Sequence, residues 1–262
     1  MDFNPLETRR PRSPVKNCEA GGSVAPFAAR LGRIPPARVS SRSPEPEQHR
    51  RAWLGLYGLG GLVGLYLTTT VPDGWFILAL GGSMGLLSLF YTYPPLKLQY
   101  HGFGEVLVGV IFGPVIMFGS YFVQARRLDV VPLVASVPFG LFVAAFLLVN
   151  EMPEWRSDPK GGKVTVPARV GLESSMKIYT ALMVAGYAWL AGAVALRFLP
   201  PLALLGLASL PLGVKAIRIL RKDFASFPKH IGANAATLQS VLVSGIGLAA
   251  AFVVPVFVAL PF

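Results

Sequence analysis

Long apolar runs separated by short polar segments occupy the chain from Ala52 onward. There are seven, at about residues 52–70, 75–92, 104–124, 130–150, 177–197, 200–220 and 236–260, and Pro211 interrupts the sixth. Each is close to the roughly 20 residues that an α-helix needs to cross about 30 Å of hydrocarbon. The pattern predicts an all-α protein, a multi-spanning transmembrane bundle of about seven helices.

The first 51 residues follow a different pattern. They hold eight prolines, ten Lys or Arg and five Asp or Glu, and no apolar run longer than a few residues. They lack the apolar core of about 7–15 residues that marks a secretory signal, and transit peptides are poor in acidic residues. We therefore expect two parts. Residues 1–51 are a basic Pro/Ser/Arg-rich tail, either disordered or misread, and residues 52–262 are the membrane domain.

Composition narrows the class of protein. Hydrophobic residues make up 53% of the chain, charged residues 14%, and the mean hydropathy is +0.56. Soluble domains carry about 25% charged residues, so this chain has too few to cover a water-facing surface. A soluble enzyme is thus nearly excluded, and so is a disordered chain, which needs low hydrophobicity. Cys18 is the single cysteine, which excludes a disulfide scaffold.

The charge distribution predicts a membrane orientation. The net charge is +11, but after Arg51 the basic residues fall in gaps between apolar runs, which is typical of membrane loops and not of a nucleic-acid groove. Successive gaps between membrane helices lie on alternate sides of the membrane. One side then has three basic residues, Arg126, Arg127 and Arg197. The other side has eleven: Lys97, Arg156, Lys160, Lys163, Arg169, Lys177, Lys215, Arg218, Arg221, Lys222 and Lys229. Cytoplasmic loops carry the excess of Lys and Arg. We expect a protein of the cytoplasmic membrane whose partner is the lipid bilayer, with the larger group in the cytoplasm and Phe262 outside.

The first unusual loop on the predicted cytoplasmic side is Tyr91–Glu105. It combines four aromatic or phenolic side chains with Lys97, a Pro-Pro turn and Glu105 at the start of the next apolar run. Taken alone, the loop is most simply an interfacial aromatic belt. A ligand site is the alternative.

The second unusual loop, Asn150–Lys163, favours a metal–diphosphate site. Asn150, Glu154 and Asp158 recur every four residues, so in a helix they share one face. Oxygen ligands at this position suit Mg²⁺, which takes one or two carboxylates together with substrate phosphates. Lys160 and Lys163 follow and can neutralise a polyphosphate. The alternative is a solvated polar loop with its own salt bridges.

Together the two loops resemble those of the UbiA superfamily of membrane prenyltransferases, and more narrowly the 1,4-dihydroxy-2-naphthoate prenyltransferases of menaquinone synthesis. The family's second acidic motif often reads Asn-Glu-Phe-Pro-Asp-Tyr-x-x-Asp, followed by Gly-Lys-x-Thr and a run ending Arg-Leu-Gly. The matching segments are NEMPEWRSD at 150–158, GKVT at 162–165 and RVG at 169–171. Residues 91–105 fit a Tyr-x-x-Pro-Pro-Leu-Lys-x-x-Tyr loop running into Gly-x-Gly-Glu. Residues 233–238 match Ala-Asn-Ala-x-Thr-Leu.

The resemblance implies a defined chemistry. The family binds an isoprenyl diphosphate through Mg²⁺ held by two acidic motifs, and an electron-rich aromatic ring captures the allylic cation. On this chain it implies a polyprenyl diphosphate and an aromatic acceptor as substrates. The implied metal ligands are Asn150, Glu154 and Asp158; the implied substrate-binding residues are Lys160, Lys163 and Asn234; and the implied catalytic residues are Lys97, Tyr91 and Tyr93. Glu154 stands where the family usually has Asp, which shifts the geometry of the site.

The chain also departs from the family pattern. The family has nine helices and a first acidic motif, Asn-Asp-x-x-x-Asp-x-x-x-Asp, which should precede the run at 52–70. No such motif occurs in residues 1–51. Three accounts stay open: a misread start of the chain, a truncated homologue without activity, or a first motif supplied by another subunit.

The predicted function is prenyl transfer to a dihydroxynaphthoate-like ring in quinone biosynthesis. The alternatives are a catalytically inactive, truncated relative and a small-molecule transporter. A transporter places ionisable residues near the membrane midplane, whereas the runs here are almost free of charge in their interiors. The pattern favours chemistry at the interface and leaves open whether the chain is a working enzyme or a relic.

Overall fold

The computed structural model describes residues 46–223 and 227–258, with side chains over 50–222 and 230–255. Most of the predicted tail, residues 1–45, and the C-terminal Phe262 lie outside the described residues. By its internal contacts the chain separates into two units, Met1–Ala52 and Trp53–Phe262. The described helices fall almost wholly in the second unit.

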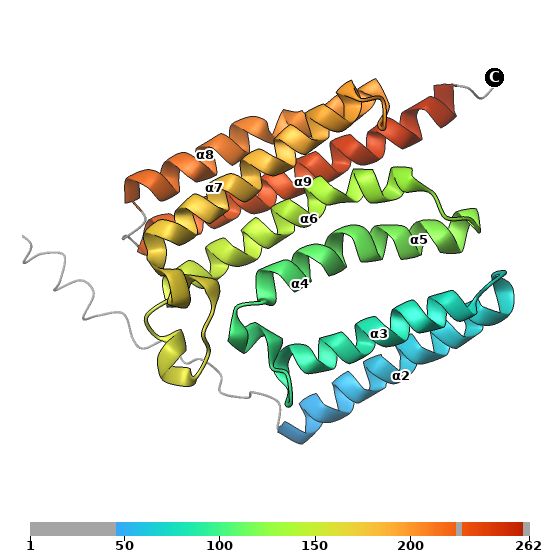
Figure 1. The fold of residues 1–262 in the computed structure, drawn as a ribbon, viewed down its shortest axis with the longest axis horizontal. Helices are drawn as coiled ribbons and strands as arrows, with labels where there is room; N and C mark the ends of the chain where they lie inside the picture. The colour runs from blue at the N-terminus through green and yellow to red at the C-terminus, as the bar shows by residue number, and fades with distance from the viewer. Residues whose placement is uncertain (1–45, 224–226, 259–262) are drawn as a thin grey trace, which may run out of the picture. The chain divides into compact units, whose positions relative to one another are not determined.

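The described residues form helices and no strand. In chain order these are α2 (Pro46–Thr70), α3 (Trp75–Thr92), η1 (Leu98–His101), α4 (Gly104–Val110), η2 (Ile111–Val115), α5 (Ile116–Ala125), α6 (Val130–Glu151), η3 (Met152–Glu154), η4 (Asp158–Gly161), α7 (Val166–Ala195), η5 (Pro201–Ser209), α8 (Leu210–Asp223) and α9 (Phe227–Val258) (Figure 1). Among these residues, seven helical stretches are long and apolar enough to cross a membrane. The predicted all-α transmembrane fold is confirmed.

Two boundaries differ from the apolar runs because helices extend past the apolar segment. The fifth run was expected from residue 177, but α7 begins at Val166, directly after Thr165, with a break at Gly171, whose φ is 79° and ψ 167°. Pro167 occupies the first turn, where its missing N–H costs nothing. Glu173 and Lys177, one turn apart, form an exposed ion pair of 2.9 Å, so polar residues continue the helix. Similarly, α9 begins at Phe227 rather than near residue 236.

The best-packed part of the bundle is formed by α6, α7, α8 and α9, which lie side by side (Figure 1). Its core includes Phe142, Leu148, Tyr179, Met183 and Leu220, each at most 1% exposed. In contrast, α3 has no buried residue. The apolar surface of α3 therefore remains available to lipid.

The third membrane span, which consists of α4, η2 and α5, packs closely on α6 through glycines. A Cβ atom on Gly113 would lie 2.8 Å from Cα of Gly140, and one on Gly140 would lie 2.5 Å from the carbonyl oxygen of Gly109. Small residues allow membrane helices to approach in this way. At this point the helix contains a π-helical turn, η2, with Pro114 inside it. The contact fixes α4, and with it Glu105 at its first turn, against α6.

Candidate functional site

The two unusual loops lie against each other at one end of the spans. The backbone N–H of Val164 donates to the carbonyl of Tyr100 at 3.0 Å. The Arg169 guanidinium donates to the carbonyl of His101, also at 3.0 Å. Both bonds join residues far apart in sequence. The structure thus brings together the two segments singled out in the sequence.

The predicted helical face through Asn150, Glu154 and Asp158 is not formed. Helix α6 ends at Glu151 and is followed by two short 3₁₀ turns, η3 and η4. Pro153 and Pro159 lie in these turns. Proline lacks the N–H of a helical hydrogen bond and disfavours helix at the residue before it. The three residues therefore lie along a folded loop and do not share a helical face. Glu154 is exposed.

A group of buried charges lies at the centre of this loop. The Lys163 ammonium is 3.5 Å from Oε1 of Glu151 and 3.7 Å from Oδ2 of Asp158. The side chains of these two acids are 8% and 9% exposed. The Thr165 hydroxyl donates to the same Asp158 oxygen at 3.1 Å. Of the predicted residues, Asp158 and Lys163 are thus in direct contact.

Glu105 and Glu151 were not among the predicted site residues. Glu105 begins α4 and is 6% exposed, as is Glu151. Their carboxyl groups adjoin, and Tyr91 lies within electrostatic reach of both. One oxygen of each acid, Oε1 of Glu105 and Oε2 of Glu151, has no hydrogen-bond partner within the described residues. The sequence did contain a signal for both residues, because Glu105 lies at the start of one apolar run and Glu151 directly follows another. Ionisable residues in membrane spans cost free energy and therefore often mark a functional site.

The remaining predicted residues occupy two further places. Asn150 donates to the carbonyl of Phe146 at 2.9 Å and accepts a hydrogen bond from the Asn234 amide, which links α6 to α9. Lys97, Tyr93 and Lys160 are exposed on the loops. The Lys97 ammonium lies 5.7 Å from the ring centroid of Tyr100.

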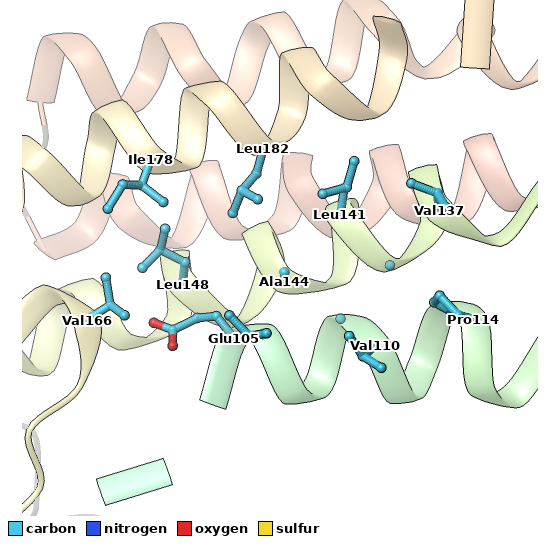
Figure 2. Close-up of a pocket in the computed structure, with 13 residues that line it drawn as sticks. Glu105, Val110, Pro114, Val137, Leu141, Ala144, Leu148, Val166, Ile178 and Leu182 are labelled. Atoms are coloured by element: carbon cyan, nitrogen blue, oxygen red, sulfur yellow. The ribbon is translucent and has the colours of Figure 1, made fainter. Parts of the chain in front are cut away.

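An apolar cavity of about 370 Å³ adjoins the buried acids. Its walls come from α4, η2, α6 and α7 and are lined by Val110, Pro114, Leu141, Leu148 and Leu182, among others. Figure 2 shows Glu105 at one end of this row of side chains. The cavity offers an apolar space next to a charged loop.

The loop supplies oxygen donors rather than a ready cluster of ligands. Over the part of the chain that the structure describes, no group of three or more His, Cys, Asp or Glu residues could hold a metal ion. Glu154 has an exposed carboxylate on this loop, whereas the Asp158 carboxylate is nearly buried and contacts Lys163 and Thr165. Mg²⁺ usually takes only one or two carboxylates and completes its shell with phosphate and water. The donor chemistry therefore fits Mg²⁺ delivered with a diphosphate.

Comparison with known proteins decides the family. The model of the UbiA prenyltransferase family matches residues 43–231. The chain belongs to the UbiA prenyltransferase family. Members of this family are membrane-embedded transferases of prenyl groups. The match confirms the predicted resemblance.

Several curated relatives have names that describe enzymes acting on naphthoate or naphthoquinone compounds. The chain is 29% identical over 63% of its length to 1,4-dihydroxy-2-naphthoate octaprenyltransferase of Bacillus subtilis. It is 32% identical over 70% of its length to the enzyme of the same name from Mycobacterium tuberculosis. It is 30% identical over 61% of its length to 2-carboxy-1,4-naphthoquinone phytyltransferase of Synechocystis. The matches cover 52%, 62% and 52% of these relatives, so the chain spans between half and two thirds of their length. No solved structure gives a significant match.

Proposed function

We propose that this UbiA family member transfers an isoprenyl group from a polyprenyl diphosphate to a hydroxylated naphthoate-type ring in quinone biosynthesis. The observation that carries the proposal is the pairing of the two motif-bearing loops beside an apolar cavity. The names of the relatives from Bacillus, Mycobacterium and Synechocystis support the choice of acceptor.

In this proposal, the second loop holds the diphosphate. Asn150, Glu154 and Asp158 would supply oxygen ligands to Mg²⁺, and Lys160 and Lys163 would contact phosphate oxygens. When bound, Mg²⁺ would neutralise the charge that grows on the departing diphosphate. The ion pairs of Lys163 with Glu151 and Asp158 support this role because they hold the ammonium in place. The ammonium would then need little reorientation during the reaction.

The first loop and the cavity would serve the acceptor and the allylic group. Tyr91, Tyr93 and Lys97 would line the approach to the reacting atoms, with Tyr91 nearest the buried acids. Asn234 would contact substrate from α9 through its place beside Asn150. The apolar walls would keep water from a reactive allylic cation, which water would otherwise capture. We further propose that both loops face the cytoplasm, from the excess of Lys and Arg on that side.

Variants of the loop acids test these assignments. The Glu154 side chain is exposed and makes no hydrogen bond or ion pair within the described residues, so Glu154→Gln should lower isoprenyl transfer by about tenfold to 100-fold while leaving thermal stability unchanged. The measurement is incorporation of labelled isoprenyl group into 1,4-dihydroxy-2-naphthoate at increasing Mg²⁺. The matched control is Glu173→Gln, since Glu173 is an exposed acid on α7 paired with Lys177. Equal transfer by the two variants would contradict a metal role for Glu154.

A catalytically inactive member of the family is the second candidate. It is favoured by the lack of any group of three ligating residues within the described residues. The same assay separates the two candidates, because an inactive member gives no labelled product from the unaltered chain at any Mg²⁺ concentration.

A further inference from the structure

The last turns of α8 carry exposed basic side chains on one side of the helix. Figure 1 shows α8 at the edge of the bundle, with its C-terminal end at the same end as the start of α7. Like charges three or four residues apart destabilise a helix unless anions balance them. We call this surface the basic face, and its four exposed residues are Lys215, Arg218, Arg221 and Lys222.

The basic face is turned away from the rest of the bundle. The packed side of α8 consists of Gly213, Ala216 and Leu220, all of them buried. A Cβ on Gly213 would lie 2.6 Å from the Tyr187 hydroxyl of α7, and Ala216 and Leu220 belong to the core formed with α6, α7 and α9. The 3.6-residue period of an α-helix places the midpoints of the packed side and the basic face roughly 180° apart.

No acid within the described residues neutralises the basic face. The cations that form ion pairs in this part of the chain are Arg127, Lys163 and Lys177. Asp223 is the only acid in the sequence after Glu173. The charge of the basic face is therefore left to anions from outside the bundle.

The position of the basic face along its span matches the headgroup layer of a bilayer. The candidate span Pro201–Lys222 includes α8, so the four cations occupy its last turns. The earlier part of the same span exposes apolar side chains, since Leu204, Leu205 and Leu210 are 42–47% exposed. Lys and Arg near the end of a span extend their charges into the interface. The change from exposed leucine to exposed cation thus indicates where hydrocarbon ends.

We propose that the basic face of α8 binds the phosphate of a negatively charged phospholipid headgroup. Clusters of four or more Lys and Arg at the end of a membrane helix attract anionic lipids. A soluble diphosphate fits this surface less well, because the basic face points away from α7 and carries no aromatic or carboxylate group. The inference goes beyond the proposed function and does not depend on it.

A matched pair of lipids tests the basic face. The full chain in a non-ionic detergent is mixed with phosphatidylglycerol or with phosphatidylcholine of the same acyl chains, and native mass spectrometry gives the affinity for the first bound lipid. We expect the first phosphatidylglycerol to bind about tenfold more tightly than the first phosphatidylcholine at low ionic strength. An excess of inorganic diphosphate should displace this lipid no more than acetate of equal ionic strength does.

The variant removes three charges from the basic face by Arg218→Gln, Arg221→Gln and Lys222→Gln. It should bind the two lipids within about threefold of each other. If it does not give a folded, monodisperse protein, Arg218→Gln with Lys222→Gln takes its place. The matched control removes the same number of exposed charges at the other end of the spans, by Arg126→Gln, Arg127→Gln and Arg197→Gln, and should keep the preference.

Loss of the preference in the α8 variant alone supports the lipid site. A wild-type chain that binds both lipids equally overturns the inference, as does an α8 variant that keeps the tenfold preference. A control that loses as much as the α8 variant shows that net charge and not this face attracts the lipid. Specific displacement by inorganic diphosphate would identify a site for soluble anions and refute the assignment to a headgroup.

Discussion

Lys163 lies between two acids that are almost completely buried. Its ammonium is 3.5 Å from Glu151 and 3.7 Å from Asp158, and it is itself 23% exposed. Removing one partner of a buried pair leaves an uncompensated charge, which costs more than the pair contributes. This arrangement makes the loop dependent on a residue that the proposed function also assigns to phosphate.

Lys163→Met should therefore destabilise the protein by about 3 kcal/mol, measured as a fall in melting temperature in detergent. Lys177→Met breaks the exposed pair with Glu173 and should change stability by less than about 1 kcal/mol. Adding Glu151→Leu to Lys163→Met should restore part of the loss, because it removes the acid that was left unpaired. If the two single variants melt alike, the buried cluster does not stabilise the loop.

Sequence reasoning at the residue scale found two of the four charged residues at this site, which are Lys163, Asp158, Glu151 and Glu105. Asp158 and Lys163 were predicted from the spacing of acids and from the resemblance, whereas Glu105 and Glu151 were not. The spacing rule applies within one helix, but α4 and α6 bring Glu105 and Glu151 together from different spans. Contacts between spans depend on helix packing, which a single sequence does not specify.

At the scale of elements, the approach of η2 to α6 positions the cavity wall. Three glycines make it possible, with Gly140 of α6 facing Gly109 and Gly113 of the third span. The π-helical turn at Ile111–Val115 and Pro114 lie in the same stretch, and such turns are frequent at functional sites. Pro114 lies within the apolar run at 104–124, but a single sequence does not indicate which helix it faces.

Gly140→Ala should consequently disrupt this contact, since its Cβ would lie 2.5 Å from the backbone oxygen of Gly109. We expect a loss of about 1–3 kcal/mol, seen as a lower melting temperature and weaker ligand binding in the cavity. The matched control is Gly61→Ala in α2, where a Cβ meets nothing within 4 Å. The control should leave stability unchanged or raise it by up to about 1 kcal/mol. A neutral Gly140→Ala would show that the two helices are not in close contact.

The start of α6 carries a pH-sensitive cap. The Asp129 carboxylate accepts a hydrogen bond from the N–H of Val131 at 3.1 Å, and this bond above all holds the pKa of Asp129 below its usual value. A lowered pKa in the folded state means that the cap stabilises the helix above the ordinary pKa of an aspartate, about 4. The contribution is lost as the pH falls through the lower, folded-state value.

Asp129→Asn should keep the cap, because Asn caps helices as well as Asp, while removing this titration. We predict that the melting temperature of the wild type falls more steeply than that of the variant as the pH drops from about 5 to 3. Near pH 7 the two should melt within a few degrees of each other. Parallel curves over the acid range would contradict the assigned role of Asp129.

For the whole molecule, the first two membrane spans differ in packing from the later spans. The candidate membrane spans Arg50–Thr70 and Trp75–Thr92 bury none of their residues, whereas the span Val130–Glu154 is the most buried of the seven. Composition and run length were enough to predict seven spans, because hydrocarbon thickness fixes helix length. They could not predict the folded loop after α6, because its two 3₁₀ turns depend on proline geometry and on contacts with the first loop.

The central claim is that this chain, whose matches cover 52–62% of the relatives compared, carries out prenyl transfer. The most direct measurement is incubation of the purified full chain in nanodiscs with radiolabelled isoprenyl diphosphate, 1,4-dihydroxy-2-naphthoate and Mg²⁺. Label is then followed into the naphthoate product. We predict labelled product that accumulates with time and disappears when EDTA removes the metal. No product above that of protein-free nanodiscs, from a chain that is folded and monodisperse, would contradict the account.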